Sequence, residues 1–481
     1  MPENPGPAPA GRQARATRQG SLVFVYFVCA VAATSGLLFG FDIAVISGAI
    51  VYLKPLWHLS ELGTEIATSS LLAGCIIGAA LAGSLSDGWG RKKALLLSAA
   101  LFAFSAVCSA FPHLLPLGHV AGVPGGFVVA RLLGGFAVGA ASLLAPLYIA
   151  EISPARIRGQ LVGLNQMAIV TGILLSYLAN WGLSFFGHES WRWMFAVAAI
   201  PALFLLIALL FVPESPRWLT EKGREGEALE VLERAAGTEE ATTAIDDLRA
   251  SIKLESGKLS ELFEPRVRPS LVIALVLAVM QQWVGVNTLL FYGSITLNDV
   301  LGWKAQTAGA PALGALALIG GVNFLSTILA LNLIDRIGRK ALLVISASTM
   351  GLCWIGLAVL FAQPHPPAVL VVVAMFLCSG TFAVGLGPGV WVLLAEIFPT
   401  KIRGRAMAVG TVTLWIACTA LTMSFPTLSR ILGQSGAQLI YAGACVFTAL
   451  FVAFRVPETR GKTLEEIERF WMERGNAKRA G

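Results

Sequence analysis

The stretch DGWGRK, from Asp87 to Lys92, recurs as DRIGRK, from Asp335 to Lys340. The second copy begins 248 residues after the first (335 − 87), and each copy directly follows a long apolar segment. A match of this kind at a large fixed offset is typical of an internal repeat. We therefore expect two related halves rather than one long domain.

Two further pairs of motifs share this spacing. EISP at 151–154 is matched by EIFP at 396–399, and VPES at 212–215 is matched by VPET at 456–459. Three matches in one order at nearly one offset argue against chance. Because both copies keep the same direction and the same membrane flank, the halves are predicted to be parallel repeats, an arrangement typical of transporters.

The composition places the chain in a membrane. Of its 481 residues, 56% are hydrophobic and only 13% are charged, whereas soluble domains carry roughly 25% charged residues. Twelve apolar segments approach the length of about 20 residues that a spanning helix needs. We predict an all-α membrane protein with twelve transmembrane helices in two six-helix bundles. The segments lie near 22–51, 63–86, 93–111, 126–150, 159–183 and 191–212, and near 270–298, 309–334, 341–363, 368–397, 404–429 and 435–456.

The basic residues predict the orientation. Lys and Arg precede the first segment and follow every second one, whereas the loop at 112–125 has none. Such residues favour the cytoplasmic side, so both termini are predicted to be cytoplasmic in a multi-pass protein of the plasma membrane, the inner membrane of a bacterium. The net charge of +7 largely reflects this bias, and no nucleic-acid partner is expected.

The predicted domains follow from these segments. An N-terminal tail (1–21), a bundle (22–212), a cytoplasmic helical linker (213–269), a second bundle (270–456) and a C-terminal tail (457–481) succeed one another. Within the linker, residues 221–252 alternate charged and apolar positions at helical spacing, which indicates two or three amphipathic helices. The linker is either a solvated connection or a brace whose charges pair with Arg158, Arg403 and their neighbours when the inner mouth is closed.

Two ionisable residues lie well inside predicted helices, where each costs about 2.5 to 3.5 kcal/mol. At 1.5 Å per residue, Asp42 lies roughly 14 Å and Arg131 roughly 8 Å below the outer surface, so we predict a buried ion pair. If a conformational change weakens this pair, Asp42 takes up a proton. The five histidines lie in outer loops or at helix ends, which leaves Asp42 as the proton carrier. The alternative is a static pair that joins helices 1 and 4.

Neutral amides form a second group near mid-span. A buried amide needs a hydrogen-bond partner, and amides both donate to and accept from hydroxyl groups, so the set suits a neutral polyol. Gly285 is expected to break helix 7 and turn two of the amides inward. The alternative is hydrogen bonding between helices. The amides are Gln166, Gln281, Gln282, Asn287 and Asn323.

Two tryptophans complete the predicted binding site. Trp391 follows the run from Gly385 to Gly389, which contains Pro388 and is expected to interrupt helix 10. Trp415 lies mid-span in helix 11. An indole face packs well on the C–H face of a sugar ring, although packing between helices is the alternative.

Acidic residues beside the repeated basic motifs indicate inner-gate salt bridges that hold one access state and break in the other. The predicted gate residues are Asp87, Arg91, Glu151, Arg158, Asp335, Arg339, Glu396 and Arg403. No metal, cofactor or enzymatic activity is expected. The seven cysteines lie in apolar segments and do not have the spacing of metal ligands. A phosphate-binding loop that ended at Gly461-Lys462-Thr463 would need glycine at position 456, where the chain has Val456.

Taken with the repeats, these strings resemble the sugar porter family of the major facilitator superfamily over nearly the whole chain. The matching strings include PLYIAE at 146–151, PESPRWL at 213–219, Gln281-Gln282 with Gly285 and Asn287, and Gly387-Pro388 with Trp391. The resemblance implies alternating access of two bundles around a central site. It also implies that Gln166, Gln281, Gln282, Asn287, Asn323 and Trp391 bind the sugar.

Asp42 is similar to the helix 1 aspartate of proton-coupled members such as bacterial xylose and glucose symporters, whereas mammalian facilitative carriers have a neutral residue there. One departure is that Leu414 and Cys418 flank Trp415 where well-known members place amides, which leaves sugar hydroxyls fewer partners. We predict a monomeric proton symporter of a hexose or pentose in the lipid bilayer. The alternatives are a facilitative uniporter, or a sugar sensor, for which the tail of 25 residues after helix 12 is short.

Overall fold

The computed structural model describes residues 19–254, 259–265, 267–301, 310–399 and 401–460. The predictions for the tails at 1–18 and 461–481 lie outside these described residues. The chain is helical almost throughout, as predicted, with one short antiparallel pair of strands, β1 (His119–Val120) and β2 (Val123–Pro124).

The long helices follow the predicted segments closely. In the first half they are α1 (Leu22–Leu56), α2 (Glu61–Trp89), α3 (Arg91–Ala110), α4 (Gly125–Ile152), α5 (Arg158–Leu183), α6 (Ser190–Ala196) and α7 (Ala199–Ala208). In the second half they are α11 (Arg268–Trp283), α12 (Val286–Leu301), α13 (Ala310–Ile337), α14 (Arg339–Phe361), α15 (Ala368–Val384), α16 (Leu386–Glu396) and α17 (Arg403–Arg455). Between the halves lie α8 (Pro216–Glu221), α9 (Glu225–Ala236) and α10 (Thr238–Leu254). Short 3-10 turns occur at η1 (Pro112–Leu114), η2 (Ala155–Ile157), η3 (Ser184–Phe186) and η4 (Leu259–Phe263).

The number of spans agrees with the prediction. Among the described residues, 11 helical stretches are long and apolar enough to cross a membrane. The last of them, α17, has 53 residues and contains Gly433 in a non-helical conformation (φ 71°, ψ 167°), so it consists of two helices joined at a sharp turn. The fold therefore has the predicted twelve spans.

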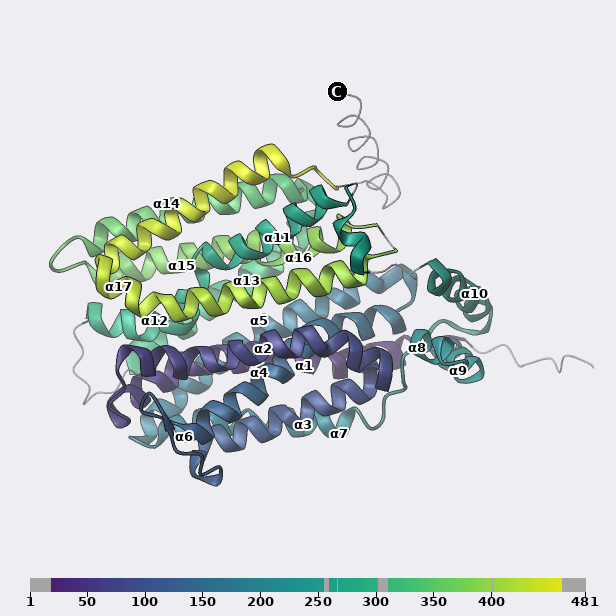
Figure 1. Ribbon diagram of the computed structural model, residues 1–481, viewed down its shortest axis with the longest axis horizontal. Helices are drawn as coiled ribbons and strands as arrows, with labels where there is room; N and C mark the ends of the chain where they lie inside the picture. Colours follow the sequence, from purple (N-terminus) through teal and green to yellow (C-terminus); the bar gives the residue numbers. More distant parts are fainter. Residues whose placement is uncertain (1–18, 255–258, 266, 302–309, 400, 461–481) are drawn as a thin grey trace, which may run out of the picture.

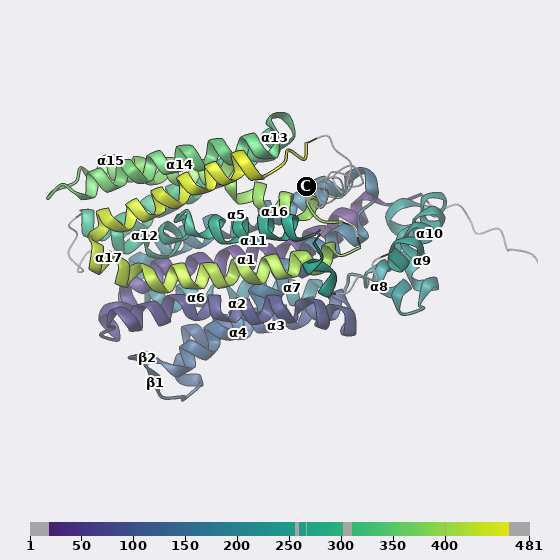
Figure 2. The same cartoon turned by 45° about the horizontal axis from the view of Figure 1, so that its top comes forward.

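The helices lie in two groups that run side by side. In Figures 1 and 2 the purple and blue helices α1–α7 form one half and the green and yellow helices α11–α17 form the other. The short helices α8–α10 project from one end of the bundle, here called the linker end. The β1–β2 hairpin lies at the opposite end, here called the hairpin end.

The sixth span differs from the single helix that we expected at 191–212. It is divided into α6 and α7 around Val197 and Ala198. Pro201 accounts for the interruption, because proline has no N–H to donate and its ring clashes with the carbonyl four residues earlier, that of Val197. The two pieces still form one apolar stretch, Ser190–Ala208.

The linker contains the predicted amphipathic helices. Trp218, Val231 and Ile245 belong to a small apolar cluster that holds α8, α9 and α10 together. The cluster is attached to the start of α1, because Ser21 N–H donates to Arg234 O (2.9 Å) and the Arg234 guanidinium lies 4.2 Å from the Phe24 ring centre. In this structure α8–α10 are therefore tied to the first half, whereas Glu261 of η4 (Leu259–Phe263) pairs with Lys401 of the second half at 2.9 Å. The action of the linker as a brace stays a prediction.

Glycines let the helices of the first half touch backbone to backbone. A Cβ at Gly135 of α4 would lie 1.8 Å from Leu71 O of α2, and one at Gly74 would lie 2.0 Å from Leu132 O. The same reciprocal contact joins α1 and α5, where a Cβ at Gly40 would lie 1.9 Å from Ile169 O. Small residues permit this close packing in membranes, and here it holds α1 and α4 in a rigid bundle.

Replacing Gly135 by alanine should destabilise the protein, because the added methyl group meets backbone that cannot yield without moving a helix. The expected cost is about 1 to 3 kcal/mol, seen as a lower melting temperature in detergent. Gly83→Ala in α2 is the control, since nothing lies within 4 Å of its Cβ position. Equal melting temperatures for the two variants would contradict this packing.

Candidate functional site

The predicted ion pair is present at the centre of the first half. Asp42 on α1 is 3% exposed and Arg131 on α4 is fully buried. Arg131 Nη1 lies 3.3 Å from Asp42 Oδ1, and Nη2 donates to the backbone oxygen of Asp42 at 2.8 Å. The guanidinium also lies 5.4 Å from the Phe195 ring centre. Arg131 Nε is buried and has no partner among the described residues, so the charge is only partly satisfied.

Both predicted helix breaks occur in the second half. Helix α11 ends at Trp283 and α12 begins at Val286, with Gly285 at φ +90° between them. A Cβ at Gly285 would lie 2.6 Å from the Tyr441 ring, so a side chain is excluded by space as well as by backbone conformation. The other break lies at Gly385, between α15 and α16.

Three of the predicted amides form a continuous hydrogen-bonded chain beside these breaks. Gln281 Nε2 donates to Leu386 O (3.0 Å) and Gly387 O (2.9 Å) at the start of α16. Gln282 Nε2 donates to Gln281 Oε1 at 3.3 Å. We call the hydrogen-bonded series of Gln281, Gln282, Asn287 and Cys418 the amide chain.

Asn287 extends the amide chain to α17. Its Nδ2 donates to Gln282 Oε1 and to Cys418 Sγ, the latter at 3.3 Å. Gln282 and Asn287 are 7% and 9% exposed. The break at Gly285 thus brings both amides to one side, as the sequence predicted.

The remaining predicted binding residues do not join the amide chain. Asn323 on α13 donates from Nδ2 to Ser379 Oγ of α15 at 3.2 Å. Gln166 on α5 and Trp391 on α16 are half-buried. A binding role for Gln166, Asn323 and Trp391 therefore stays a prediction.

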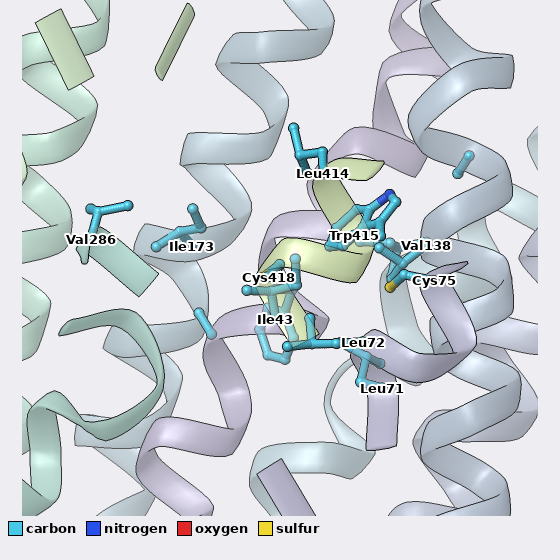
Figure 3. Packing of buried hydrophobic residues seen from close by; sticks show 14 of the residues in the cluster. Ile43, Leu71, Leu72, Cys75, Val138, Ile173, Val286, Leu414, Trp415 and Cys418 are labelled. Carbon is cyan, nitrogen blue, oxygen red and sulfur yellow. The ribbon is translucent and has the colours of Figure 1, made fainter. Parts of the chain in front are cut away.

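Trp415 lies in apolar packing between the halves. It is 2% exposed and its ring centre lies 5.6 Å from that of Phe39 on α1. Figure 3 shows Trp415 near Cys75 of α2 and Val138 of α4, with Leu414 close to it along α17. The indole Nε1 is buried without a partner among the described residues. This wall of the site is apolar.

The repeated motifs at the linker end build the same cluster in each half. Arg91 Nε and Nη2 donate to the two carboxylate oxygens of Glu151, each at 3.0 Å, and Ser215 Oγ donates to the same carboxylate. In the second half, Arg339 Nη2 donates to Glu396 Oε1 at 3.1 Å, and Thr459 Oγ1 donates to Oε2 at 2.6 Å. In this structure each of these pairs joins elements of one half.

The other predicted gate residues lie around these clusters. Asp87 is exposed and lies 3.6 Å from Arg91 Nη1, and Arg158 is exposed at the start of α5. Arg403 Nη2 donates to Phe398 O at 3.5 Å. The side chain of Asp335 lies outside the described part of the structure. A role of the whole set in gating stays a prediction.

Two glutamates in the third repeated motif were missed by the sequence analysis. Glu214 accepts from the backbone N–H of Lys92 (3.0 Å), and Glu458 accepts from those of Arg339 and Lys340 (3.1 Å each). Each carboxylate therefore caps the N-terminus of a spanning helix, α3 or α14, where negative charge is favourable. Their recurrence in the PES and PET strings was the signal that could have found them.

The halves are joined directly at the hairpin end. Glu65 Oε1 of α2 accepts from Thr427 N (3.2 Å) and Thr427 Oγ1 (2.7 Å) of α17. Arg430 and Glu61 form an ion pair at 3.1 Å. A pocket at this end is lined by these residues together with Lys54, and it is separate from the amide chain. The structure is therefore held together at the hairpin end.

Within the described ranges, no group of three or more His, Cys, Asp or Glu side chains is arranged to hold a metal ion. The polar interior instead consists of an ion pair, neutral amides and helix ends. This arrangement can bind a neutral hydroxyl-rich molecule and change the charge of one carboxyl group.

Known proteins resemble this chain over most of its length. A family model described as "Sugar (and other) transporter" matches residues 28–471. The D-xylose-proton symporter of Escherichia coli (strain K12) is 37% identical over 484 residues, which cover 93% of this chain and 96% of that protein. The arabinose-proton symporter of Bacillus subtilis (strain 168) is 35% identical over 467 residues, covering 95% and 97%.

A solved structure has the same fold. The partially occluded inward open conformation of the xylose transporter XylE from E. coli aligns with a TM-score of 0.80 at 36% identity, covering 92% of this chain and 100% of that chain.

Removing the arginine of the first linker-end cluster should be costly, because Arg91→Leu leaves the buried Glu151 carboxylate without its bidentate partner. The expected loss is about 3 to 5 kcal/mol, measured as a lower melting temperature in detergent. The control is Arg224→Leu, which breaks the exposed pair with Glu227 and should cost about 0 to 1 kcal/mol. A similar small loss in both variants would contradict a structural role for the Arg91–Glu151 pair.

Proposed function

This chain belongs to the sugar porter family of the major facilitator superfamily, and we propose that it carries a neutral monosaccharide across the membrane together with a proton. The observation that carries the proposal is the buried pair of Asp42, mid-span in α1, and Arg131, nearer the start of α4. The relatives named above as symporters of xylose and arabinose support coupling to a proton.

Asp42 is the proposed proton carrier, and Arg131 is its partner. Uptake of a proton by the carboxylate removes its attraction to the guanidinium, but the bond from Arg131 Nη2 to the backbone oxygen of Asp42 does not depend on that charge. Arg131 can therefore stay in place while its charge loses a counter-ion. A buried charge without a partner is costly, so protonation favours a rearrangement of α1 against α4.

The proposed sugar site is the space beside the amide chain. Gln282 keeps one N–H, and Asn287 keeps its Oδ1, outside the hydrogen bonds of the described residues. Gln166, Asn323 and the indoles of Trp391 and Trp415 complete the proposed contacts, together with Gln281. On the α17 side, Leu414 and Cys418 offer little hydrogen bonding, so the site suits a hexose or pentose whose hydroxyls face α11 and α12.

Alternating access gives the two ends of the bundle their roles. We assign the hairpin end to the outside, and the linker (213–269) and both termini to the cytoplasm of a bacterial inner membrane. The bundles at 22–212 and 270–456 would then rock about the site in a single protomer. The Arg91 and Arg339 clusters stabilise the linker end of each bundle. Contact between these two ends would close the inner gate. The hairpin end, where Glu65 accepts from Thr427, is then the closed outer side in this structure.

The first test is uptake of radiolabelled xylose, arabinose and glucose into proteoliposomes with and without an inward proton gradient. The wild type should accumulate sugar above equilibrium only with the gradient. Asp42→Asn should lose accumulation but keep sugar exchange, because the amide cannot carry a proton, whereas Asp246→Asn on the exposed face of α10 should match the wild type. Gradient-independent equilibration by both the wild type and Asp42→Asn would instead identify a uniporter.

A further inference from the structure

We propose that Phe195 is a positioning residue for the proton carrier. Its ring holds the Arg131 guanidinium when Asp42 takes up a proton, and it thereby raises the pH at which Asp42 is loaded. The inference rests on the proposed proton symport and adds one residue, on the short helix α6, to that machinery.

The contacts of Arg131 show what can hold it after proton uptake. The ion pair with Asp42 Oδ1 (3.3 Å) depends on the charge of the carboxylate, whereas the bond from Nη2 to Asp42 O (2.8 Å) does not. Arg131 Nε has no partner within the described ranges. A further contact is the ring of Phe195, whose centre lies 5.4 Å from the guanidinium carbon. Arg131 and Phe195 are 0% and 1% exposed, so both are kept from bulk water.

The ring of Phe195 acts most strongly on an unpaired Arg131. The face of an aromatic ring attracts a cation, and the attraction is larger where both groups are desolvated. While Asp42 is ionised, its carboxylate is the main partner of the guanidinium. After proton uptake that partner is neutral, and the ring remains a source of negative potential. Phe195 therefore stabilises the protonated state of Asp42 more than the ionised state.

Four aromatic side chains keep Phe195 in place. Phe127 packs on Phe195 with ring centres 5.4 Å apart, and Trp57 packs on Phe127 at 5.2 Å. Trp191 packs on Trp57 at 5.6 Å. We call these four residues the aromatic group. Phe127 lies one turn before Arg131 in α4, nearer the hairpin end, so the group lies on the hairpin side of the ion pair.

Helix α6 is itself anchored to α3. Arg192 Nη1 donates to Ala110 O at the end of α3 (2.8 Å), and the Arg192 guanidinium lies 4.4 Å from the Trp191 ring centre. The helix ends at Ala196, one residue after Phe195. Phe195 is therefore fixed by α3 and α6, which carry neither Asp42 nor Arg131.

The ionisable surroundings of Asp42 are simple. Arg131 of α4 acts on Asp42, and Cys75 of α2 interacts with both members of the pair. Cys75 is fully buried, where a thiol stays neutral. In the part of the chain that the structure describes, no titratable side chain of α3, α5, α6 or α12 acts on Asp42. A change in the pH dependence of loading therefore reports on Asp42 and Arg131.

Fluorination of Phe195 tests the contact, because fluorine withdraws electron density from the ring face and largely keeps the shape of the ring. Trifluorophenylalanine is introduced at position 195 by codon suppression, and Phe195→Leu removes the ring face altogether. Sugar uptake is measured against external pH, and the midpoint of its decline at alkaline pH is compared. Without the ring the protonated state is less favourable, so both variants should shift this midpoint to the acid side by about 0.5 to 1 pH unit, a threefold to tenfold weaker proton affinity.

The matched control is trifluorophenylalanine at position 127, in a ring that packs on Phe195. It makes the same chemical change inside the aromatic group without altering the ring under the guanidinium, and its midpoint should stay within about 0.2 pH unit of the wild type. Equal shifts from fluorination at 127 and 195 would overturn the proposal, as would an unchanged midpoint at 195. The fluorinated ring keeps the test available where Phe195→Leu does not fold.

An infrared titration separates this proposal from proton symport. The band of the protonated Asp42 carboxyl group, identified by its loss in Asp42→Asn, reports the proton affinity of that group without any transport. Its midpoint should move to the acid side when Phe195 is fluorinated. Uptake by the wild type that ignores the proton gradient would contradict symport, whereas a carboxyl band that does not move would contradict the role of Phe195.

Discussion

The absence of water in the bilayer core is the constraint on which this structure depends, because every buried charge and every freed backbone group must find a partner inside the protein. Asp42 and Arg131 satisfy it as a pair across α1 and α4. The interrupted helices of the second half satisfy it with side-chain donors, from Trp354 to Val284 O and from Gln281 to the start of α16. The few polar groups of the interior therefore occur in sets.

The duplicated motifs form the same cluster at the linker end of each half, although the mid-span parts of the halves differ. At the linker end, an arginine, a glutamate, a hydroxyl and a capping glutamate recur in both halves, in the clusters of Glu151 and Glu396. At mid-span the halves differ. The first keeps α1 continuous, has backbone contacts between helices through Gly135 and Gly40, and carries the ion pair. The second has breaks at Gly285 and Gly385 and carries all of the predicted amides except Gln166. The proposed proton carrier therefore lies in the first half, and most of the proposed sugar site lies in the second.

Helix α17 connects the amide chain with the helix that carries the ion pair. Cys418 ends the amide chain, and Trp415, less than one turn away, packs against Phe39 of α1, the helix that carries Asp42. Because α1 belongs to the first half and α17 to the second, this contact lies between the halves. The Trp415–Phe39 contact therefore offers a physical route between the proposed sugar site and the helix of the proposed proton carrier.

The sequence by itself determined the spans, both helix breaks and the burial of Asp42 and Arg131, because lipid penalises charge and only glycine and proline interrupt a helix in this way. It did not anticipate the interruption at Pro201 or the capping role of Glu458. The tertiary structure alone decided that Gln281 bonds to the backbone of α16, 105 residues away, and that Glu65 joins Thr427, 362 residues away. Such partners depend on which helices pack together, and no local pattern of residues encodes that choice.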